Sequence, residues 1–347
     1  MIEADAEDTD LPMPPLTLSV VIPVYNEEAG LPVLFARLYP ALDSLGIGYE
    51  VIFVNDGSND RSAAMLREQF ARRADVTRVI LLNANYGQHL AIMAGFQRTR
   101  GNRVVTLDAD LQNPPEEVGK LLAKMDEGYD YVGGVRAERR DTWFRRNASR
   151  LLNRIRERTT RIQMSDQGCM LRAYSRQIVD AINKCEEIST FIPALAYTFS
   201  SNPTEIEVLH EERAAGETKY SLYKLVRLNF DLVTGFSIAP LQLLSIIGFL
   251  LAAGSIGAVI FQIFNRLIRG DVAEGVFQSM SEGIQFFLFG VVLLGIGLLG
   301  EYIGRIYQEV LRRPRFIVSF VLEERPGAEV TVLVNKPAEI NKPFTIR

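Results

Sequence analysis

Residues 103–117 of the chain read RVVTLDADLQNPPEE, and this stretch decides the fold. A buried strand is predicted over 103–107, and it ends at two carboxylates, Asp108 and Asp110. The Pro-Pro pair at 114–115 is typical of a helix start. Because side chains alternate along an extended strand, both carboxylates can point the same way from its carboxyl end. Ligands of open α/β sheets bind at that edge.

The two carboxylates and the amide oxygen of Gln112 predict a metal site. Such a hard, oxygen-only set suits Mg²⁺ or Mn²⁺ carrying a diphosphate. The alternative is that Asp108 and Asp110 only cap a helix, as Asp and Asn often do. Their position after a buried strand and before Pro-Pro-Glu-Glu favours the metal site.

The rest of residues 18–180 alternates short apolar strands with helical segments. Strands are predicted at 18–23, 49–55, 76–82, 103–107 and 129–133, and helices at 27–44, 88–99 and 116–127. Near-continuous apolar strands of this kind indicate an α/β fold, Rossmann-like, with a mostly parallel sheet covered on both faces. The G-x-G-x-x-G match at 295–300 has no strand before it, so it does not predict a dinucleotide site.

Composition excludes several classes of protein. The 347-residue chain has a formal net charge of −4, which predicts no nucleic-acid partner. Its two cysteines form no C-x-x-C pair, so a disulfide framework is not expected. The two histidines, His89 and His210, are far apart in sequence, which argues against a zinc site.

Two apolar spans are expected to cross a membrane. No charged residue occurs between Asp231 and Arg266, a span longer than the roughly 20 residues that cross a bilayer. A second uncharged span, 283–300, is the expected return helix, and its Gly300 and Gly304 have the spacing of close helix contacts. Basic residues flank the outer ends of both spans, which predicts that both ends are cytosolic. Apolar residues at helical spacing before the first span indicate an amphipathic helix on the membrane surface.

Residues 136–161 contain ten arginines and only three acids. Such a run is compatible with a solvated helix face, with nucleic-acid binding or with phosphate binding. The expected membrane spans favour the last reading. Together these features indicate an enzyme that moves a group from a soluble nucleotide donor to a lipid phosphate at the bilayer surface.

Five motifs carry a resemblance to a known family. They are VIPVYNE (21–27), DGS (56–58), DADLQNPPE (108–116), GETKYS (216–221) and GEYIGRIY (300–307). Over roughly 18–322 the chain resembles the polyisoprenyl-phosphate glycosyltransferases of glycosyltransferase family 2, which have the GT-A fold. The segments 85–95, 168–174 and 189–193 look most similar to the members that transfer 4-deoxy-4-formamido-L-arabinose to undecaprenyl phosphate.

The resemblance implies a UDP-sugar donor, an undecaprenyl phosphate acceptor, inversion at the anomeric carbon and a homotetramer. It also implies the bacterial inner membrane, with the catalytic domain in the cytosol, and a role in lipid A modification and polymyxin-type resistance. Asn55 and Ala84 stand where the family often has Asp and Arg, so transfer of glucose, mannose or N-acetylglucosamine stays open. A processive polysaccharide synthase and an inactive membrane scaffold also stay open.

The resemblance also implies roles for individual residues. Those expected to bind the nucleotide are Pro23, Tyr25, Glu27, Asp56 and Asp108. Those expected to hold the metal and the diphosphate are Asp108, Asp110 and Gln112. Those expected to meet the lipid phosphate are Arg136, Arg145, Ser149, Arg213 and Lys219. Asp166 is a candidate base, or alternatively a turn residue, and Asp110 is the other expected catalytic residue.

The predicted organisation follows the chain in seven parts. They are a disordered acidic tail (1–17), a GT-A domain (18–215), an amphipathic juxtamembrane helix (216–235), a first transmembrane helix (236–266), a periplasmic loop (267–282), a second transmembrane helix (283–308) and a cytosolic C-terminal segment (309–347).

Overall fold

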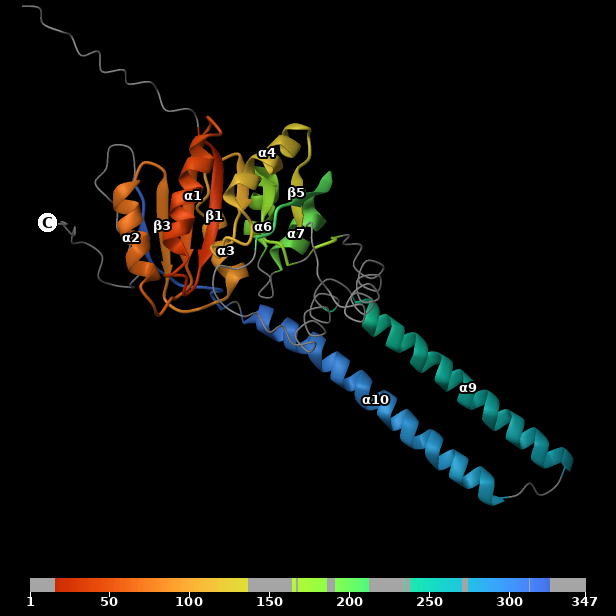
Figure 1. The fold of residues 1–347 in the computed structure, drawn as a ribbon. Helices are drawn as coiled ribbons and strands as arrows, with labels where there is room; N and C mark the ends of the chain where they lie inside the picture. The colour runs from red at the N-terminus through yellow and green to blue at the C-terminus, as the bar shows by residue number, and fades with distance from the viewer. Residues whose placement is uncertain are drawn as a thin grey trace, which may run out of the picture. The chain divides into compact units, whose positions relative to one another are not determined.

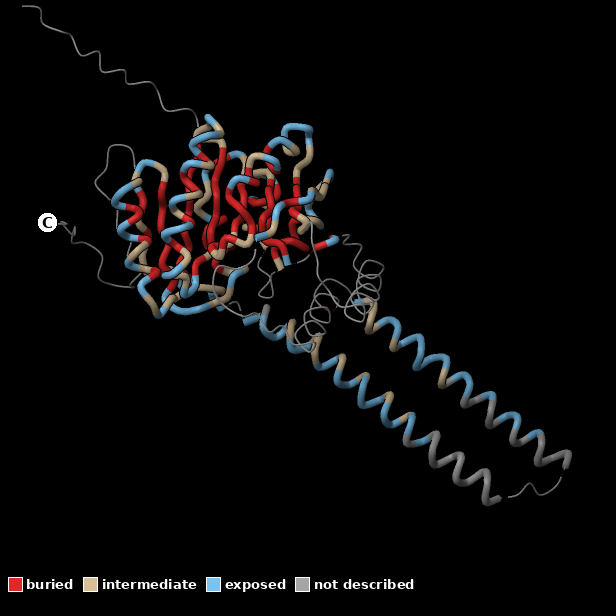
Figure 2. The backbone as a smooth tube through the Cα atoms, in the orientation of Figure 1, coloured by how far each residue is buried: buried red, intermediate tan, exposed pale blue. Residues whose placement is uncertain are grey.

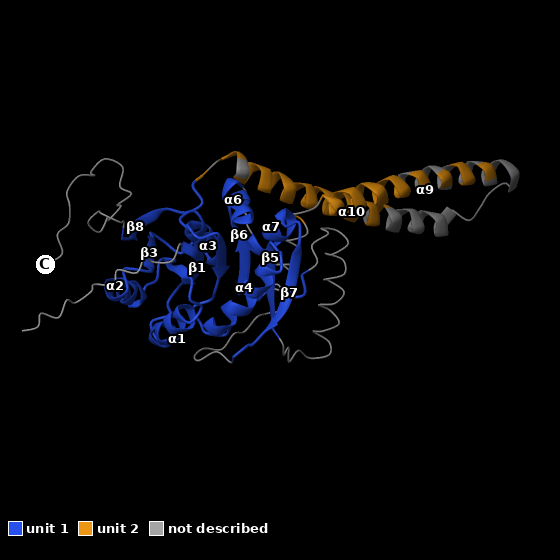
Figure 3. Cartoon of the chain, turned by 90° about the horizontal axis from the view of Figure 1, so that it is seen from above, with its two compact units in different colours: residues 1–142, 162–219, 314–347 blue, residues 143–161, 220–313 orange. Residues whose placement is uncertain are grey.

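The computed structural model describes residues 16–136, 164–166, 168–185, 191–211, 234, 238–269, 274–311 and 313–324. These residues form two compact units, one built on a sheet and one on two long helices (Figure 3). The predictions for Arg145, Ser149, Arg213 and Lys219, and for the amphipathic helix at 216–235 apart from Thr234, lie outside the described residues.

The first unit is built on an eight-stranded sheet with the order β7-β5-β6-β4-β1-β2-β3-β8 (Figure 1). The strands are β1 (Leu16–Val24), β2 (Gly48–Asn55), β3 (Thr77–Leu82), β4 (Arg103–Thr106), β5 (Tyr131–Arg136), β6 (Arg172–Ser175), β7 (Pro203–Val208) and β8 (Val318–Leu322). Only β6 and β8 run against the other strands of this sheet. The predicted α/β fold with a mostly parallel sheet is confirmed. The sequence patterns did not predict β6, β7 or β8, and β1 begins within the predicted tail.

Helices cover both faces of the sheet. They are α1 (Leu31–Asp43), α2 (Ser62–Arg72), α3 (Gln88–Phe96), α4 (Val118–Asp126) after the short 3₁₀ helix η1 (Pro115–Glu117), α6 (Arg176–Lys184) and α7 (Ile192–Phe199). Figure 3 shows α1, α2 and α4 on one face and α3 and α6 on the other. Alternate residues of β1 divide between these layers, since Val20 belongs to the α1 side of the core and Val21 contacts Gly95 of α3. Figure 2 shows the buried residues concentrated in the strands between the layers.

The central strands end at the same edge. In the parallel pairing of β1 with β2, Val24 is opposite Asn55, and in the pairing of β1 with β4, Val21 is opposite Thr106. The segments that follow β1, β2 and β4 therefore emerge side by side.

The second unit contains the antiparallel helices α9 (Ala239–Arg269) and α10 (Glu274–Val310), which lie side by side (Figure 1). They extend through most of the predicted loop at 267–282. Of the described helices, one segment, Phe287–Gln308, is long and apolar enough to cross a membrane, with 22 residues and a mean hydropathy of 2.0. Ala239–Leu251 is apolar but shorter, so the first of the two predicted transmembrane helices stays a prediction.

Among the described residues, α9 and α10 approach each other closely at Gly295. A Cβ on Gly295 would lie 3.0 Å from Cδ2 of Leu244, whereas a Cβ on Gly300 or Gly304 would have no described atom within 4 Å. That the spacing of Gly300 and Gly304 would allow a close helix contact stays a prediction. The spacing of two glycines permits close packing but does not determine which turn of the helix faces the neighbour.

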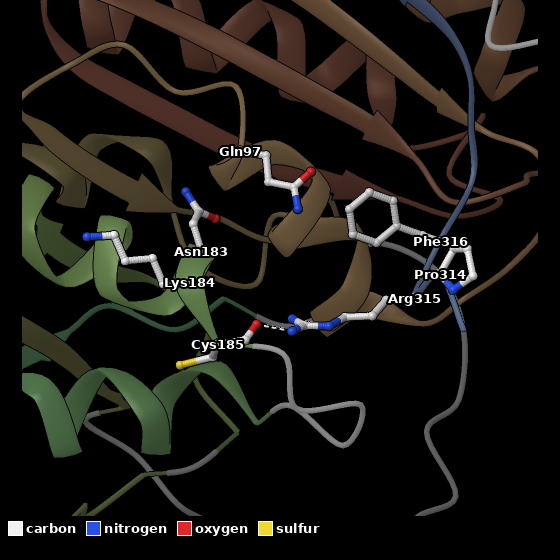
Figure 4. Close-up of a pocket in the computed structure, with 7 residues that line it drawn as sticks. All are labelled: Gln97, Asn183, Lys184, Cys185, Pro314, Arg315 and Phe316. Atoms are coloured by element: carbon white, nitrogen blue, oxygen red, sulfur yellow. Dashed lines mark hydrogen bonds between the residues drawn. The ribbon is translucent and has the colours of Figure 1, made fainter. Parts of the chain in front are cut away.

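After α10 the chain returns to the first unit. Arg315 donates a hydrogen bond to the carbonyl oxygen of Cys185. The segment beside it helps to line a cavity of about 470 Å³ (Figure 4). The lining residues are Gln97, Asn183, Lys184, Cys185, Pro314, Arg315 and Phe316. β8 then pairs antiparallel with β3, so the two ends of the helical unit are attached to the same domain.

A buried ionic cluster fastens the end of β8. Arg78, at the start of β3, donates to Glu50 over 3.0 Å and also to Glu323, which follows β8. All three side chains are less than one-tenth exposed. Buried charges are tolerated only when they are paired in this way.

We predict that Glu323→Ala destabilises the protein by about 3 kcal/mol, because removing one partner leaves the Arg78 charge buried with part of its compensation lost. The measurement is thermal or denaturant unfolding of the purified full-length protein. Glu324→Ala is the matched control, since Glu324 is the next residue and is exposed. Equal effects of the two substitutions would contradict this account of how β8 is held.

Candidate active site

Predicted site residues from three strand ends come together at the carboxyl edge of the sheet. Tyr25 and Glu27 follow β1, Asp56 follows β2, and Asp108 lies two residues beyond β4. The segments that follow β1 and β4 approach each other closely at Gly30. A Cβ there would lie 3.5 Å from Oε2 of Glu27 and 3.7 Å from the carbonyl oxygen of Ala109.

The loops after β1 and β2 are hydrogen-bonded to each other. The backbone N–H of Asn26 donates to Oγ of Ser58 over 3.0 Å, and Oδ1 of Asn26 accepts from the N–H of Asn59 over 2.9 Å. Asn26 has a φ of 54°, a left-handed conformation that Asn tolerates better than most residues. The preceding Tyr25 side chain remains 44% exposed. The aromatic ring of Tyr25 is therefore available for stacking by a nucleobase. Pro23, also predicted to bind the nucleotide, lies within β1 opposite Val54.

The carboxylate of Asp56 fixes the loop that leads into α3. Asp56 is 2% exposed, and it accepts hydrogen bonds from the backbone N–H groups of Tyr86 (2.7 Å) and Gly87 (2.8 Å). Burial raises the pKa of Asp56, and the two backbone donors oppose that effect without cancelling it. In the structure, Asp56 thus holds the backbone of the loop at Tyr86 and Gly87. Its contact with uridine stays a prediction.

Gly57 allows the same loop to pack directly on the end of β2. Its φ is +66°, and a Cβ at this position would lie 2.4 Å from the carbonyl carbon of Ala84. Only glycine satisfies both conditions without strain. The loop then presents Gln88, the first residue of α3, whose Nε2 donates a hydrogen bond to Oδ1 of Asp108. Gln88 was not among the predicted site residues.

The acidic loop after β4 has a strained backbone. Oδ1 of Asp110 accepts a hydrogen bond from the N–H of Gln112 over 3.2 Å, which closes a tight turn around Leu111. Leu111 has a φ of 60°, a conformation that costs a non-glycine residue about 1–2 kcal/mol. Its side chain is buried in the core, and that burial offsets the strain. β4 ends at Thr106, so Asp108, Asp110 and Gln112 lie in a short loop and not at the end of an extended strand.

The donor set of this loop fits a divalent cation held together with a substrate. In the part of the chain that the structure describes, no group of three or more His, Cys, Asp or Glu side chains is arranged to hold a metal ion. Two half-buried carboxylates and an amide oxygen are instead what Mg²⁺-type sites use when phosphate oxygens and water complete the coordination. The metal-ligand roles of Asp108, Asp110 and Gln112 stay predictions.

Asp166 forms a two-point ion pair with Arg136. Its carboxylate accepts from Nε of Arg136 over 2.6 Å and from Nη2 over 2.9 Å, and also from the N–H of Gly168 over 3.0 Å. Asp166 is 1% exposed, whereas the Arg136 side chain is 25% exposed. This geometry favours a positioning role for Asp166, because its oxygens orient the guanidinium predicted to meet the lipid phosphate. Its predicted role as a base is untested.

A buried arginine supports the loop that carries Asp166. Arg172 of β6 is fully buried, and it donates to the carbonyl oxygens of Cys169 (2.8 Å) and Asp166. Carbonyl oxygens inside a protein need such donors, so Arg172 fixes the backbone on which the Asp166–Arg136 pair is built.

His210 is a second residue of this region that sequence reasoning missed. It follows β7, and its pKa is lowered by burial and by the charge of Arg136, while Asp110 and Asp166 act in the opposite direction. Its electrostatic neighbours are thus predicted site residues. The sequence did not identify His210 because β7 was not predicted, and it is the parallel pairing of β7 with β5 that brings the carboxyl end of β7 to the same edge.

The segment around His210 is tied to the acidic loop. The N–H of Glu211 donates to the carbonyl oxygen of Gln112 over 2.9 Å. Arg37 of α1 binds both Glu116 (3.0 Å) and Glu211 (2.9 Å), which joins η1 to the end of this segment. The strand β7 therefore contributes a fourth segment to the site.

One family model and several solved structures are similar to parts of this chain. Residues 19–182 match the family model described as Glycosyl transferase family 2. A solved structure of glucosyl-3-phosphoglycerate synthase from Mycobacterium tuberculosis with phosphoglyceric acid is 19% identical, with 63% of this chain and 78% of that chain covered and a TM-score of 0.44. Its complex with Mn²⁺, UDP-glucose and phosphoglyceric acid is 18% identical, with 63% and 77% covered and a TM-score of 0.43. S. aureus TarS 1–349 with UDP-GlcNAc is 17% identical, with 63% and 71% covered and a TM-score of 0.40.

The match over 19–182 contains β1 to β6 and the acidic loop. The chain therefore carries a family 2 glycosyltransferase domain with a GT-A-like, mostly parallel sheet, and the protein is an enzyme of the transferase class.

We predict that Gly57→Ala lowers glycosyl transfer by about 10²-fold, because a displaced loop at 84–88 misplaces groups at the site. Gly46→Ala is the matched control, since Gly46 has a nearly equal φ of +65° but open space around a Cβ. Both substitutions should cost about 1–2 kcal/mol of stability for the left-handed backbone. The measurements are transfer rate and thermal unfolding of each variant. A Gly57→Ala enzyme as active as Gly46→Ala would refute the role given to the loop.

Proposed function

We propose that this enzyme transfers 4-deoxy-4-formamido-L-arabinose from its UDP-sugar to undecaprenyl phosphate with inversion, releasing UDP. One observation carries the choice of a lipid acceptor. The chain leaves the catalytic sheet, forms the apolar helix segment Phe287–Gln308, and returns to the same sheet as β8. An apolar helix attached to the catalytic domain at both ends of its unit would hold the site at a bilayer, where lipid phosphates are the accessible acceptors.

The donor half of the reaction uses the three strand ends described above. Tyr25, Glu27, Asp56 and Pro23 would bind the uridine, as the family resemblance implies. Asp108, Asp110 and Gln112 would hold Mg²⁺ or Mn²⁺ together with the diphosphate. A metal ion bound there supplies neutralisation of the charge that develops on the departing UDP.

The acceptor half depends on arginine. A phosphate monoester has its second pKa at about 6, so it is already largely a dianion at cytosolic pH and needs positioning more than a base. The forked guanidinium of Arg136, oriented by Asp166, suits two phosphate oxygens. Further proposed phosphate ligands are Arg145, Ser149, Arg213 and Lys219. A phosphate oxygen then attacks the anomeric carbon as the bond from that carbon to the UDP oxygen breaks, which inverts the configuration.

The same proposal gives the enzyme its place in the cell. α9 and α10 would span the inner membrane of a bacterium as a hairpin, and the catalytic domain would lie in the cytosol. The enzyme would act as a homotetramer in lipid A modification and polymyxin-type resistance. The family resemblance supports these statements.

A second sugar is the main alternative. Ala84 lies on the loop that packs on Gly57, at a position where the family often has Arg. Because Ala replaces Arg so close to the end of β2, the identity of the transferred sugar stays open. Glucose, mannose and N-acetylglucosamine are the alternatives.

The test is a panel of UDP-sugars assayed with undecaprenyl phosphate and Mn²⁺, with UDP release and the anomer of the product as readouts. We expect UDP release only when both the lipid phosphate and a metal are present. Asp110→Ala should lower the rate of UDP release by about 10²-fold or more. Asp180→Ala removes an exposed carboxylate on α6 and should change little.

Two results would count against the proposal. UDP release with water as the sole acceptor would exclude the lipid reaction. Turnover of UDP-glucose or UDP-N-acetylglucosamine, with refusal of the formamido-arabinose donor, would exclude the proposed sugar and leave the lipid reaction standing.

A further inference from the structure

We infer that Gln88 is a positioning residue that couples the nucleotide side of the site to its metal side. It does so by holding the carboxylate of Asp108 from a loop that is itself held by Asp56. The inference rests on the proposed role of Asp108 as a ligand of the metal–diphosphate complex.

The first link is the hydrogen bond from Nε2 of Gln88 to Oδ1 of Asp108. This donor on one carboxylate oxygen restricts rotation of the carboxylate plane. Carboxylates that bind metal ions are commonly oriented by such hydrogen bonds from outside the coordination sphere. A neutral amide does this without adding charge beside the cation.

The second link fixes Gln88 itself. The two residues before it donate their backbone N–H groups to the carboxylate of Asp56, at 2.7 and 2.8 Å. Further along the same helix, Ala91–Phe96 of α3 are all buried. Gln88 is therefore an exposed side chain on an anchored backbone, with a bonded loop on one side and a packed helix on the other.

The two links give Asp56 and Asp108 a common support. A ligand that restricts the motion of the loop at 83–88 also restricts Gln88. Through its hydrogen bond, Gln88 then restricts the carboxylate of Asp108. Coupling between two binding events is reciprocal, so UDP should strengthen Mn²⁺ binding by the same factor by which Mn²⁺ strengthens UDP binding. Gln88 should carry part of that factor.

A purely structural role for Gln88 makes a different prediction. Because the side chain is exposed, its removal leaves the core of α3 intact, and a structural role would change thermal stability or nothing. The role inferred here changes Mn²⁺ affinity while the unfolding temperature of the metal-free protein stays the same.

The experiment measures Mn²⁺ binding to the full-length protein by electron paramagnetic resonance of the free ion, with and without UDP. Gln88→Met keeps the length of the side chain and removes the donor, and Gln88→Asn keeps the donor and shortens its reach. Both should weaken Mn²⁺ binding in the presence of UDP by about 10-fold to 10²-fold. Gln97→Met is the control, since Gln97 is an exposed glutamine at the opposite end of α3.

The outcomes separate the inference from the function on which it rests. If the wild type binds no Mn²⁺ even with UDP, the proposed metal site is wrong, and the inference is overturned with it. If the wild type binds Mn²⁺ and both Gln88 variants match Gln97→Met, the metal site stands and only the inference is overturned. Weakened binding with an unchanged unfolding temperature in either Gln88 variant supports it.

Discussion

The parallel pairing of β1 with β2 on one side and β4 on the other is the constraint on which the site depends. A buried hydrogen bond from Ser19 to Glu50 (2.7 Å) and another from the N–H of Gly101 to Ser19 (2.8 Å) hold the amino ends of these strands together. With the register set at that end, the opposite ends deliver the loops beginning at Tyr25, Asp56 and Asp108 to one edge. A slip of one residue would turn each side chain to the other face of the sheet.

The residues at this edge divide into those that would touch ligands and those that hold them. Asp56 anchors a loop, Gln88 orients Asp108, and Asp166 orients Arg136. Asp108 and Arg136 thus each have a partner that fixes the direction of the side chain, which is what catalysis by positioning and electrostatics requires. The apolar helix segment Phe287–Gln308 is the observation behind the proposed lipid acceptor.

Sequence patterns predicted the features that depend on interactions within one short stretch of the chain. The strands of the parallel core and the helix start at the Pro-Pro pair of 114–115 were predictable, because apolar strands and prolines act through their local sequence. The pairing of β8 with β3 and the ion pair of Arg136 with Asp166 were not, because each joins residues far apart in sequence. The contact of Gln88 with Asp108 escaped prediction for the same reason, although both lie in motifs that were recognised.

The most direct test of the central claim is the position of Mn²⁺ in a crystal of the enzyme with UDP, located by its anomalous scattering. The account predicts a peak among the carboxylates of Asp108 and Asp110 and the side-chain oxygen of Gln112, with the diphosphate of UDP completing the coordination. UDP bound at this edge with no manganese peak in the acidic loop, or with the peak at other side chains, would contradict it.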